Sequence, residues 1–233
     1  GPERVIELES LSSARLLPPE MLHRKIEATM GTPWHYVHTE TKWLLDDRWY
    51  LFPYGGIDSV GVTKRLTEPN GVMASVGLRM AMEMACKITT YDFIQPASER
   101  FLFPHVELTD EPMFYDSQGN NTGVNNPLTE AKAKQNIQHL FAQLLGEELA
   151  IDDEEIQIAY DLFYDTWVEG MTAIEAGSIS INLWGACAPG LNPRDGTPIL
   201  TEDRIVKDRN YLIRAWRAVI SYLLADLRML YEL

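Results

Sequence analysis

Residues 208–231 read DRNYLIRAWRAVISYLLADLRMLY. Apolar residues recur in this stretch at intervals of three and four, which is the spacing of one face of an α-helix. They form two adjacent rows: Leu212, Trp216, Val219, Leu223 and Leu230, and beside them Ile213, Ile220, Leu224 and Leu227. So wide an apolar face predicts a helix that is buried on two sides. We therefore expect the rest of the chain to supply other helices that cover it.

A second apolar run lies at residues 71–89, where apolar residues cover more than one face of the expected helix. Because little of that surface is polar, we expect this helix to lie at the centre of the fold. A shorter helix is expected at residues 20–30. Pro18 and Pro19 precede it and Gly31 follows it, and proline is typical of a helix start and glycine of a helix end.

Residues 129–145 and 152–170 form another pair of predicted helices, each with an apolar stripe. Thr129 is a typical capping residue for the first of them. The second begins with Asp and Glu in the spacing of a capping box, and Gly170 is a typical stop signal. Since only a short link joins the two helices, we expect them to pack antiparallel.

The segments between these helices are rich in turn-forming residues. Residues 116–126 are mostly Asp, Ser, Asn, Gly and Gln, and residues 177–203 contain Gly and Pro too often for a regular element. β-favouring residues at 36–39 and 49–52 predict a small β-hairpin. The predicted fold class is mainly α: an irregular helical domain of four to six helices with long Gly- and Pro-rich loops and a small β-hairpin.

The chain has 233 residues, with 34 Asp and Glu against 20 Lys and Arg, and its formal net charge is −14. A surface this acidic repels phosphate groups, which excludes nucleic acids and anionic membrane surfaces as expected partners. No apolar run approaches the roughly 18 to 20 residues that cross a bilayer, so we expect no membrane insertion.

The chain opens with Gly1 and Pro2, which resemble the stub left when a protease removes an affinity tag. We therefore treat residues 1–2 as a tag-cleavage scar. Residues 3–233 are expected to form a single helical domain excised from a longer protein.

Aromatic residues crowd the stretch 34–54 more densely than a small hairpin requires. Aromatic surfaces recognise sugar rings and protein partners, whereas packing in the core explains the same residues without a ligand. The candidate binding residues are Trp34, Tyr36, Trp43, Trp49 and Tyr54.

His35 and His38 are the candidate metal-ligating histidines. On a helix the two rings would share a face and could bind a metal, but on a strand they would point to opposite sides. Several methionines could supply thioether ligands to copper or haem, although methionine is equally a filler of apolar cores. These methionines are Met73, Met80, Met82 and Met84.

Oxygen-bearing side chains that could bind calcium gather in two loops. Asp116 and Asn120 belong to the first, without the spacing of an EF-hand, and Asp195, Glu202 and Asp203 belong to the second. Turn formation explains the same residues without an ion. We find no complete catalytic motif, so no catalytic residue is predicted.

Cys86 and Cys187 are the two cysteines. They form neither CxxC nor CxxCH, which excludes a self-contained zinc ribbon, a thioredoxin-type site and a local haem c attachment. Two alternatives remain open at this point. Either the pair forms a disulfide that closes a loop of about 100 residues, or both are buried thiols.

Three stretches of the sequence are distinctive together: YGGIDS at 54–59 followed by PNGVM at 69–73, NIQHL at 136–140, and YLIRAW at 211–216. They resemble the C-terminal region of large secreted proteins of environmental bacteria. These proteins have no known function and are often accompanied by c-type cytochrome modules. The resemblance implies a secreted or periplasmic location, an oxidising environment and a domain that works beside other domains, and it implies no catalytic residues.

An oxidising location, the presence of only two cysteines and the turn-rich surroundings of Cys187 together predict a Cys86–Cys187 disulfide. The leading functional hypothesis is a non-catalytic module that docks other domains of its polypeptide or an extracellular ligand and holds no cofactor. The alternative is a redox accessory domain or enzyme that holds haem or copper through His or Met residues.

Overall fold

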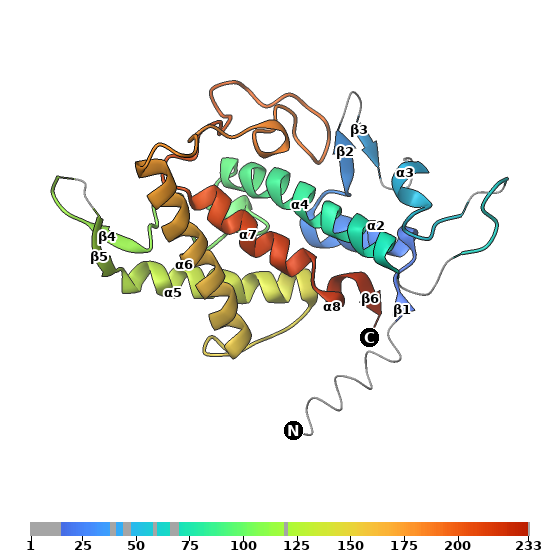
Figure 1. Cartoon of the computed structure of the whole chain (residues 1–233), viewed down its shortest axis with the longest axis horizontal. Helices are drawn as coiled ribbons and strands as arrows, with labels where there is room; N and C mark the ends of the chain where they lie inside the picture. Colours follow the sequence, from blue (N-terminus) through green and yellow to red (C-terminus); the bar gives the residue numbers. More distant parts are fainter. Residues whose placement is uncertain are drawn as a thin grey trace. The chain divides into compact units, whose positions relative to one another are not determined.

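The computed structural model describes residues 15–37, 41–43, 48–57, 60–65, 70–118 and 121–232. The described chain is mainly helical with small antiparallel β-hairpins, which confirms the predicted fold class (Figure 1). It divides into two compact units, Gly1–Glu83 with Leu224–Leu233 and Met84–Leu223. That residues 3–233 form a single domain stays a prediction.

The first unit contains helix α2, Pro19–Met30, which begins and ends where the sequence predicts. Gly31 closes it in a left-handed conformation with φ of 70°, and its N–H donates to the carbonyl of Glu27. The apolar face of α2 is buried. The other elements of this unit are β1 (Arg15–Leu16) paired antiparallel with β6 (Tyr231–Glu232), β2 (His35–Val37) paired antiparallel with β3 (Thr41–Trp43), and the short helices α3 (Arg48–Leu51) and α8 (Leu227–Leu230).

Helix α4, Gly71–Ile94, is longer than predicted and contains the boundary between the units. Its second half is almost entirely buried, as expected of a central helix. In its first half, Val72, Leu78 and Met82 are more than half exposed, at 58%, 54% and 58%. The expectation of burial along the whole helix is therefore wrong for that half.

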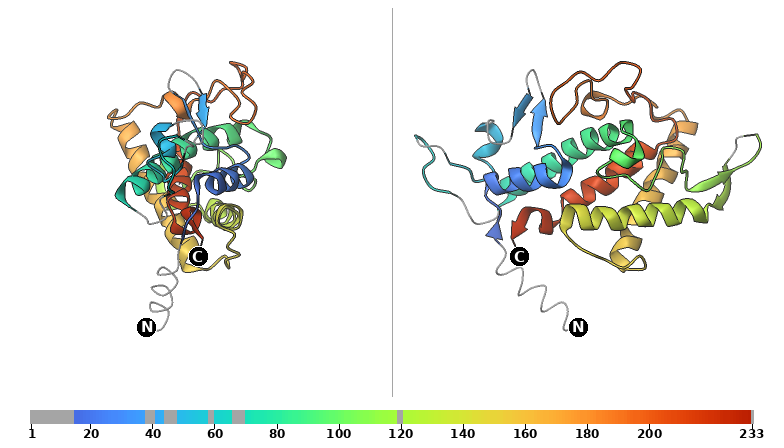
Figure 2. Two further views of the ribbon diagram at one scale, coloured as in Figure 1. Left: turned by 90° about the vertical axis from the view of Figure 1, so that its right-hand side faces the viewer. Right: turned by 180° about the vertical axis from the view of Figure 1, so that it is seen from behind.

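The second unit is built from the end of α4 and three further long helices. Figures 1 and 2 show that α6 crosses α5, so the predicted antiparallel packing of this pair is wrong. In the core, the ring of Trp216 lies against the rings of Phe103 and Phe163, with centroids 5.4 and 4.4 Å apart. The elements are the 3₁₀ turn Ala97–Glu99, β4 (Met113–Tyr115) paired antiparallel with β5 (Asn121–Asn125), α5 (Pro127–Leu140) with a π-helical turn at Phe141–Leu145, α6 (Glu154–Glu175), the 3₁₀ turn Gly185–Cys187, and α7 (Leu212–Leu224).

Several helix ends differ from the predicted ones because other side chains provide the caps. Asn126 caps α5, so that Thr129 lies buried in the first turn, and Asp153 rather than Asp152 caps α6. Asp226 caps α8, and the helix predicted over 208–231 is consequently two helices. The β-favouring residues at 49–52 lie in and after α3, not in a strand, and the predicted loop 116–126 contains β5.

A buried carboxylate fixes the chain after α4. Asp92 is fully buried, and its two oxygens accept hydrogen bonds at 2.9 Å from the backbone N–H groups of Phe101, Leu102 and Phe103. The buried amide of Asn136 on α5 holds the same segment, since its Nδ2 donates to the carbonyl of Leu102 at 3.0 Å. These contacts satisfy polar groups that would otherwise be buried without partners.

Candidate functional site

The irregular segment 177–206 of the second unit is held at its middle by a disulfide. Cys86 on α4 and Cys187 in this segment are bonded, with their Cα atoms 4.4 Å apart, which confirms the predicted disulfide. Beside the bond, the hydroxyl of Thr90 donates to the carbonyl of Cys187 at 2.8 Å. The segment is therefore fixed to α4 by a covalent bond and by a hydrogen bond that is buried.

Hydrogen bonds from α7 and within the segment itself complete its attachment. Arg214 on α7 donates from Nη2 to the carbonyls of Ser180 and Asn182, both at 2.8 Å. The backbone N–H of Leu183 donates to the carbonyl of Val206 at 2.9 Å. Although it has little regular secondary structure, the segment is thus well anchored at both ends and at its centre.

The start of α7 supports this arrangement. The buried carboxylate of Asp208 accepts from the N–H groups of Ile213 and Arg214, both at 3.1 Å. Tyr211, which lies between Asp208 and Ile213 in the sequence, adopts a left-handed conformation with φ of 57°, which is rare for a residue with a side chain. Its ring lies against Gly170 of α6 and beneath the guanidinium of Arg214, whose carbon is 5.2 Å from the ring centroid.

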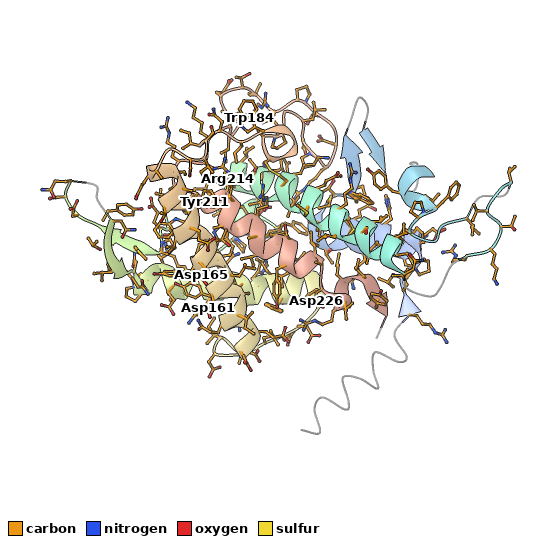
Figure 3. The ribbon with its side chains drawn as sticks, viewed as in Figure 1. Asp161, Asp165, Trp184, Tyr211, Arg214 and Asp226 are labelled. Atoms are coloured by element: carbon orange, nitrogen blue, oxygen red, sulfur yellow. A yellow bond between two sulfur atoms is a disulfide. The ribbon has the colours of Figure 1, made fainter. Side chains whose placement is uncertain are left out.

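The anchored segment presents apolar side chains to solvent. Trp184 is 74% exposed and directly precedes the 3₁₀ turn that ends at Cys187 (Figure 3). The other large apolar residues of this segment that are more than a third exposed are Ile179, Leu191, Leu200 and Val206. An exposed tryptophan on a fixed backbone is an unusual feature, because tryptophan is a highly buried residue on average.

A cation lies against the disulfide. Nη1 of Arg217 on α7 is 3.4 Å from Sγ of Cys187 and 3.7 Å from Sγ of Cys86. Cys187 is only 7% exposed and packs with Leu183 and Ile213, whereas Cys86 is partly exposed. The two sulfur atoms therefore share one guanidinium, but the two residues differ in exposure.

A separate cavity of about 260 Å³ opens beside α5 and contains the only pair of histidines whose rings meet among the described residues. The rings of His105 and His139 are 5.8 Å apart and nearly perpendicular. Burial, and secondly the neighbouring His139, lower the pKa of His105. Both effects favour the neutral form of the His105 imidazole. The remaining lining residues are Gln135, Gln138, Ala142, Glu148 and Leu149.

The tautomer of His139 follows from its hydrogen bond. Its Nε2 lies 2.9 Å from the carbonyl oxygen of Phe101, which only accepts, so Nε2 carries a proton. Within the residues that the structure describes, no three His, Cys, Asp or Glu side chains converge on one point as metal ligands would. The cavity thus offers two imidazoles, two side-chain amides and one carboxylate as hydrogen-bonding groups.

Two of the five predicted aromatic binding residues are buried. Trp34 and Tyr54 are each 1% exposed and belong to the core, so neither offers its ring to a ligand at the surface. The ring of Trp34 packs edge-on against Tyr50, with centroids 5.1 Å apart. The side chains of Tyr36, Trp43 and Trp49 lie outside what the structure describes, and binding through them stays a prediction.

Only one of the two predicted metal-binding histidines is described. His35 begins strand β2 and not a helix, and His38 lies outside the described residues. Three of the four candidate methionines, Met73, Met80 and Met84, fill the core and are 1–2% exposed. The fourth, Met82, is exposed. Haem and copper ligation stay predictions.

The calcium candidates take part in turns. Asp116 accepts from the N–H of Gln118 at 2.9 Å, and Asp195 accepts from the N–H of Thr197 at 2.9 Å. Asn120 lies outside the described residues. Calcium binding stays a prediction, although turn formation accounts for the carboxylates of Asp116 and Asp195.

Trp184 and Arg217 were not recognisable as site residues in the sequence. Trp184 lies in a stretch whose Gly and Pro content indicates a loop, and its position three residues before Cys187 is the one signal that could have indicated a fixed, exposed ring. Arg217 has the spacing of a polar residue on an amphipathic helix, and only the folded chain brings it to the sulfur atoms.

Comparisons with known proteins do not identify the chain. No protein-family model matches it, and neither a curated protein nor a solved structure shows significant similarity to it. Among the described residues, no helix combines the length and the apolar character needed to cross a membrane.

Proposed function

We propose that this chain is a non-catalytic binding module that works in a secreted or periplasmic location. In this proposal the segment 177–206 docks a protein partner, with Trp184 as the central contact. The observation that carries the proposal is the 74% exposure of Trp184 on a segment fixed by a disulfide and by hydrogen bonds. The disulfide supports the location, because such bonds persist mainly outside the reducing cytoplasm.

Two physical arguments favour a protein partner. Tryptophan is enriched among the residues that dominate the energy of protein interfaces, where its ring fills a pocket of the partner. Because the segment is already fixed, binding would order few additional groups and would lose little conformational entropy. The further exposed apolar residues of the same segment favour a protein surface over a single sugar ring, which needs polar partners around the indole.

Photo-crosslinking followed by reconstitution tests the proposal. The chain with a benzophenone amino acid at position 184 is exposed to the secreted fraction of the cells that produce it, and a crosslinked protein is identified and purified. Calorimetry then compares the binding of the original chain, Trp184→Ala and the matched control Leu128→Ala, since Leu128 is also 74% exposed but lies on α5.

We expect Trp184→Ala to raise the dissociation constant by about 30-fold or more. This corresponds to the loss of about 2 kcal/mol of binding free energy that is expected for a dominant interface residue. Leu128→Ala should bind like the original chain. The proposal is overturned if the purified partner binds Trp184→Ala with unchanged affinity, or if both variants lose affinity equally. It is also overturned if Trp184 binds soluble polysaccharides in affinity electrophoresis and no protein is crosslinked.

A further inference from the structure

The position of Arg217 is not explained by the needs of a structural disulfide. The sulfur atoms of an intact disulfide are neutral and accept hydrogen bonds only weakly, so a cation gains little beside them. A thiolate, by contrast, carries a full negative charge, and a neighbouring Arg lowers the pKa of a cysteine thiol. Arg217 lies within 3.7 Å of both sulfur atoms, where it would stabilise a thiolate formed by cleavage of the bond.

The two sulfur atoms are also unequal in a way that assigns them different roles. Cys86 is partly exposed whereas Cys187 is buried, so Cys86 is the more accessible of the two residues to an external thiolate. Cys187 is 7% exposed and lies among apolar side chains, and Arg217 is closer to its Sγ than to that of Cys86. In thiol–disulfide exchange, the sulfur with the better-stabilised thiolate leaves faster.

We propose that the Cys86–Cys187 bond is a thiol-exchange site, in which a dithiol reductant attacks Sγ of Cys86 and Arg217 stabilises the thiolate of Cys187 that leaves. One thiolate of the reductant forms a mixed disulfide with Cys86, and the electron pair of the broken S–S bond moves to Sγ of Cys187. The second thiolate of the reductant then attacks the reductant's own sulfur in the mixed disulfide, which forms the reductant's internal disulfide and releases Cys86 as a thiolate. The products are two reduced cysteines and the oxidised reductant, with two electrons and two protons transferred.

Other charged groups lie on the elements that carry the disulfide. Asp208, before α7, interacts electrostatically with Arg217, and Lys87 follows Cys86 on α4. Nη2 of Arg204 donates to the carbonyl of Ala188 at 3.0 Å. Asp208 partly offsets the charge of Arg217, but its carboxylate is already bonded to the backbone N–H groups that begin α7.

Reduction would remove the covalent attachment of the segment 177–206 to α4. The hydrogen bond from Thr90 and those from Arg214 would remain, so the segment would be loosened and not released. Exchange at the disulfide is independent of the proposed function, since it does not require Trp184 to bind a partner.

The rate of reduction of the folded protein tests the inference. The original chain, Arg217→Met, Arg217→Lys and the control Arg209→Met are treated with dithiothreitol, and alkylation with mass spectrometry counts the free thiols. Arg209 is a suitable control because it is an exposed Arg near the start of the same helix. We expect reduction of Arg217→Met to be slower by about 3- to 10-fold, Arg217→Lys to be intermediate, and Arg209→Met to be unchanged.

A second readout separates stabilisation of the thiolate from a purely structural role of Arg217. The pH dependence of iodoacetamide alkylation of the reduced protein reports the thiol pKa, which should rise by about one unit or more in Arg217→Met. A structural role would lower thermal stability without this rise. The inference fails if the reduction rate and thiol pKa of Arg217→Met equal those of the original chain.

The original chain alone provides a further test, should Arg217→Met not fold. Brief reaction with glutathione followed by acid quenching traps the mixed disulfide, and peptide mapping locates it. The inference requires glutathione on Cys86. Predominant modification of Cys187, or a bond that resists millimolar dithiothreitol until the protein unfolds, would overturn it.

Discussion

Replacing Gly170 by Ala tests the packing of α6 against the start of α7. Gly170 lies inside α6, and a methyl group at its Cα would overlap Cγ, Cδ1 and Cε1 of the Tyr211 ring. The ring has little freedom to move, because the carbonyl of Tyr211 accepts from the N–H of Ala215 and the guanidinium of Arg214 lies over the ring, 5.2 Å from its centroid. We therefore expect Gly170→Ala to destabilise the second unit.

Two opposing effects set the magnitude. Alanine is favoured over glycine in a helix interior by about 1 kcal/mol. Forcing extra atoms into a packed core costs about 1–3 kcal/mol and occasionally more. An overlap with three ring atoms lies at the upper end of that range, so the net loss should be about 1–2 kcal/mol. For a chain of this size, each kcal/mol lowers Tm by about 2–4 °C.

Gly71→Ala is the matched control for helix propensity. Gly71 begins α4, no atom lies within 4 Å of its added Cβ, and its φ is not positive. It should leave stability unchanged or increase it by up to about 1 kcal/mol. Urea unfolding followed by circular dichroism gives both values. A Gly170→Ala protein as stable as the original chain would show that Tyr211 does not pack against α6 as described.

Two further changes test other parts of the second unit. Asn136→Ala removes a fully buried amide that donates to the carbonyl of Leu102 and accepts from the N–H of His105. The free energy of unfolding in urea should fall by about 2–4 kcal/mol, because a buried carbonyl and a partly buried N–H lose their partner. His139→Gln removes the neighbouring imidazole that helps to lower the pKa of His105 and should therefore raise that pKa, which NMR titration of the ring protons measures. The pKa of His105 in the folded protein is lowered from 6.5, so this imidazole binds a proton more tightly in the unfolded chain than in the folded one. The stability contributed by the neutral ring should therefore be lost as the pH falls below about 6.5.

Local signals in the sequence predicted most of the helices, but distant contacts decided where several of them end. Gly31 ends α2 as predicted, because its left-handed conformation needs only a local hydrogen bond. Gly170 carries the same signal but lies inside α6, which continues to Glu175. At this position glycine accommodates the ring of Tyr211, which is 41 residues away in sequence and therefore invisible to a local pattern.

The candidate site was only partly predictable for the same reason. The pairing of Cys86 with Cys187 could be inferred because there are only two cysteines. The roles of Trp34 and Trp184 could not, since exposure is set by the neighbours that the fold supplies: Trp34 is buried and Trp184 is exposed. For Trp34 and Tyr54, aromatic density in the sequence therefore indicated a part of the core rather than a surface.

The disulfide also gives the chain a covalent ring, because it joins residues 101 positions apart and encloses α5 and α6. During synthesis, this ring cannot close until both helices have left the ribosome. The exposed strand β5 lies within the ring. A protease that nicks the backbone there would produce two fragments that still migrate as one molecule, and they would separate only after the sulfur–sulfur bond is cleaved.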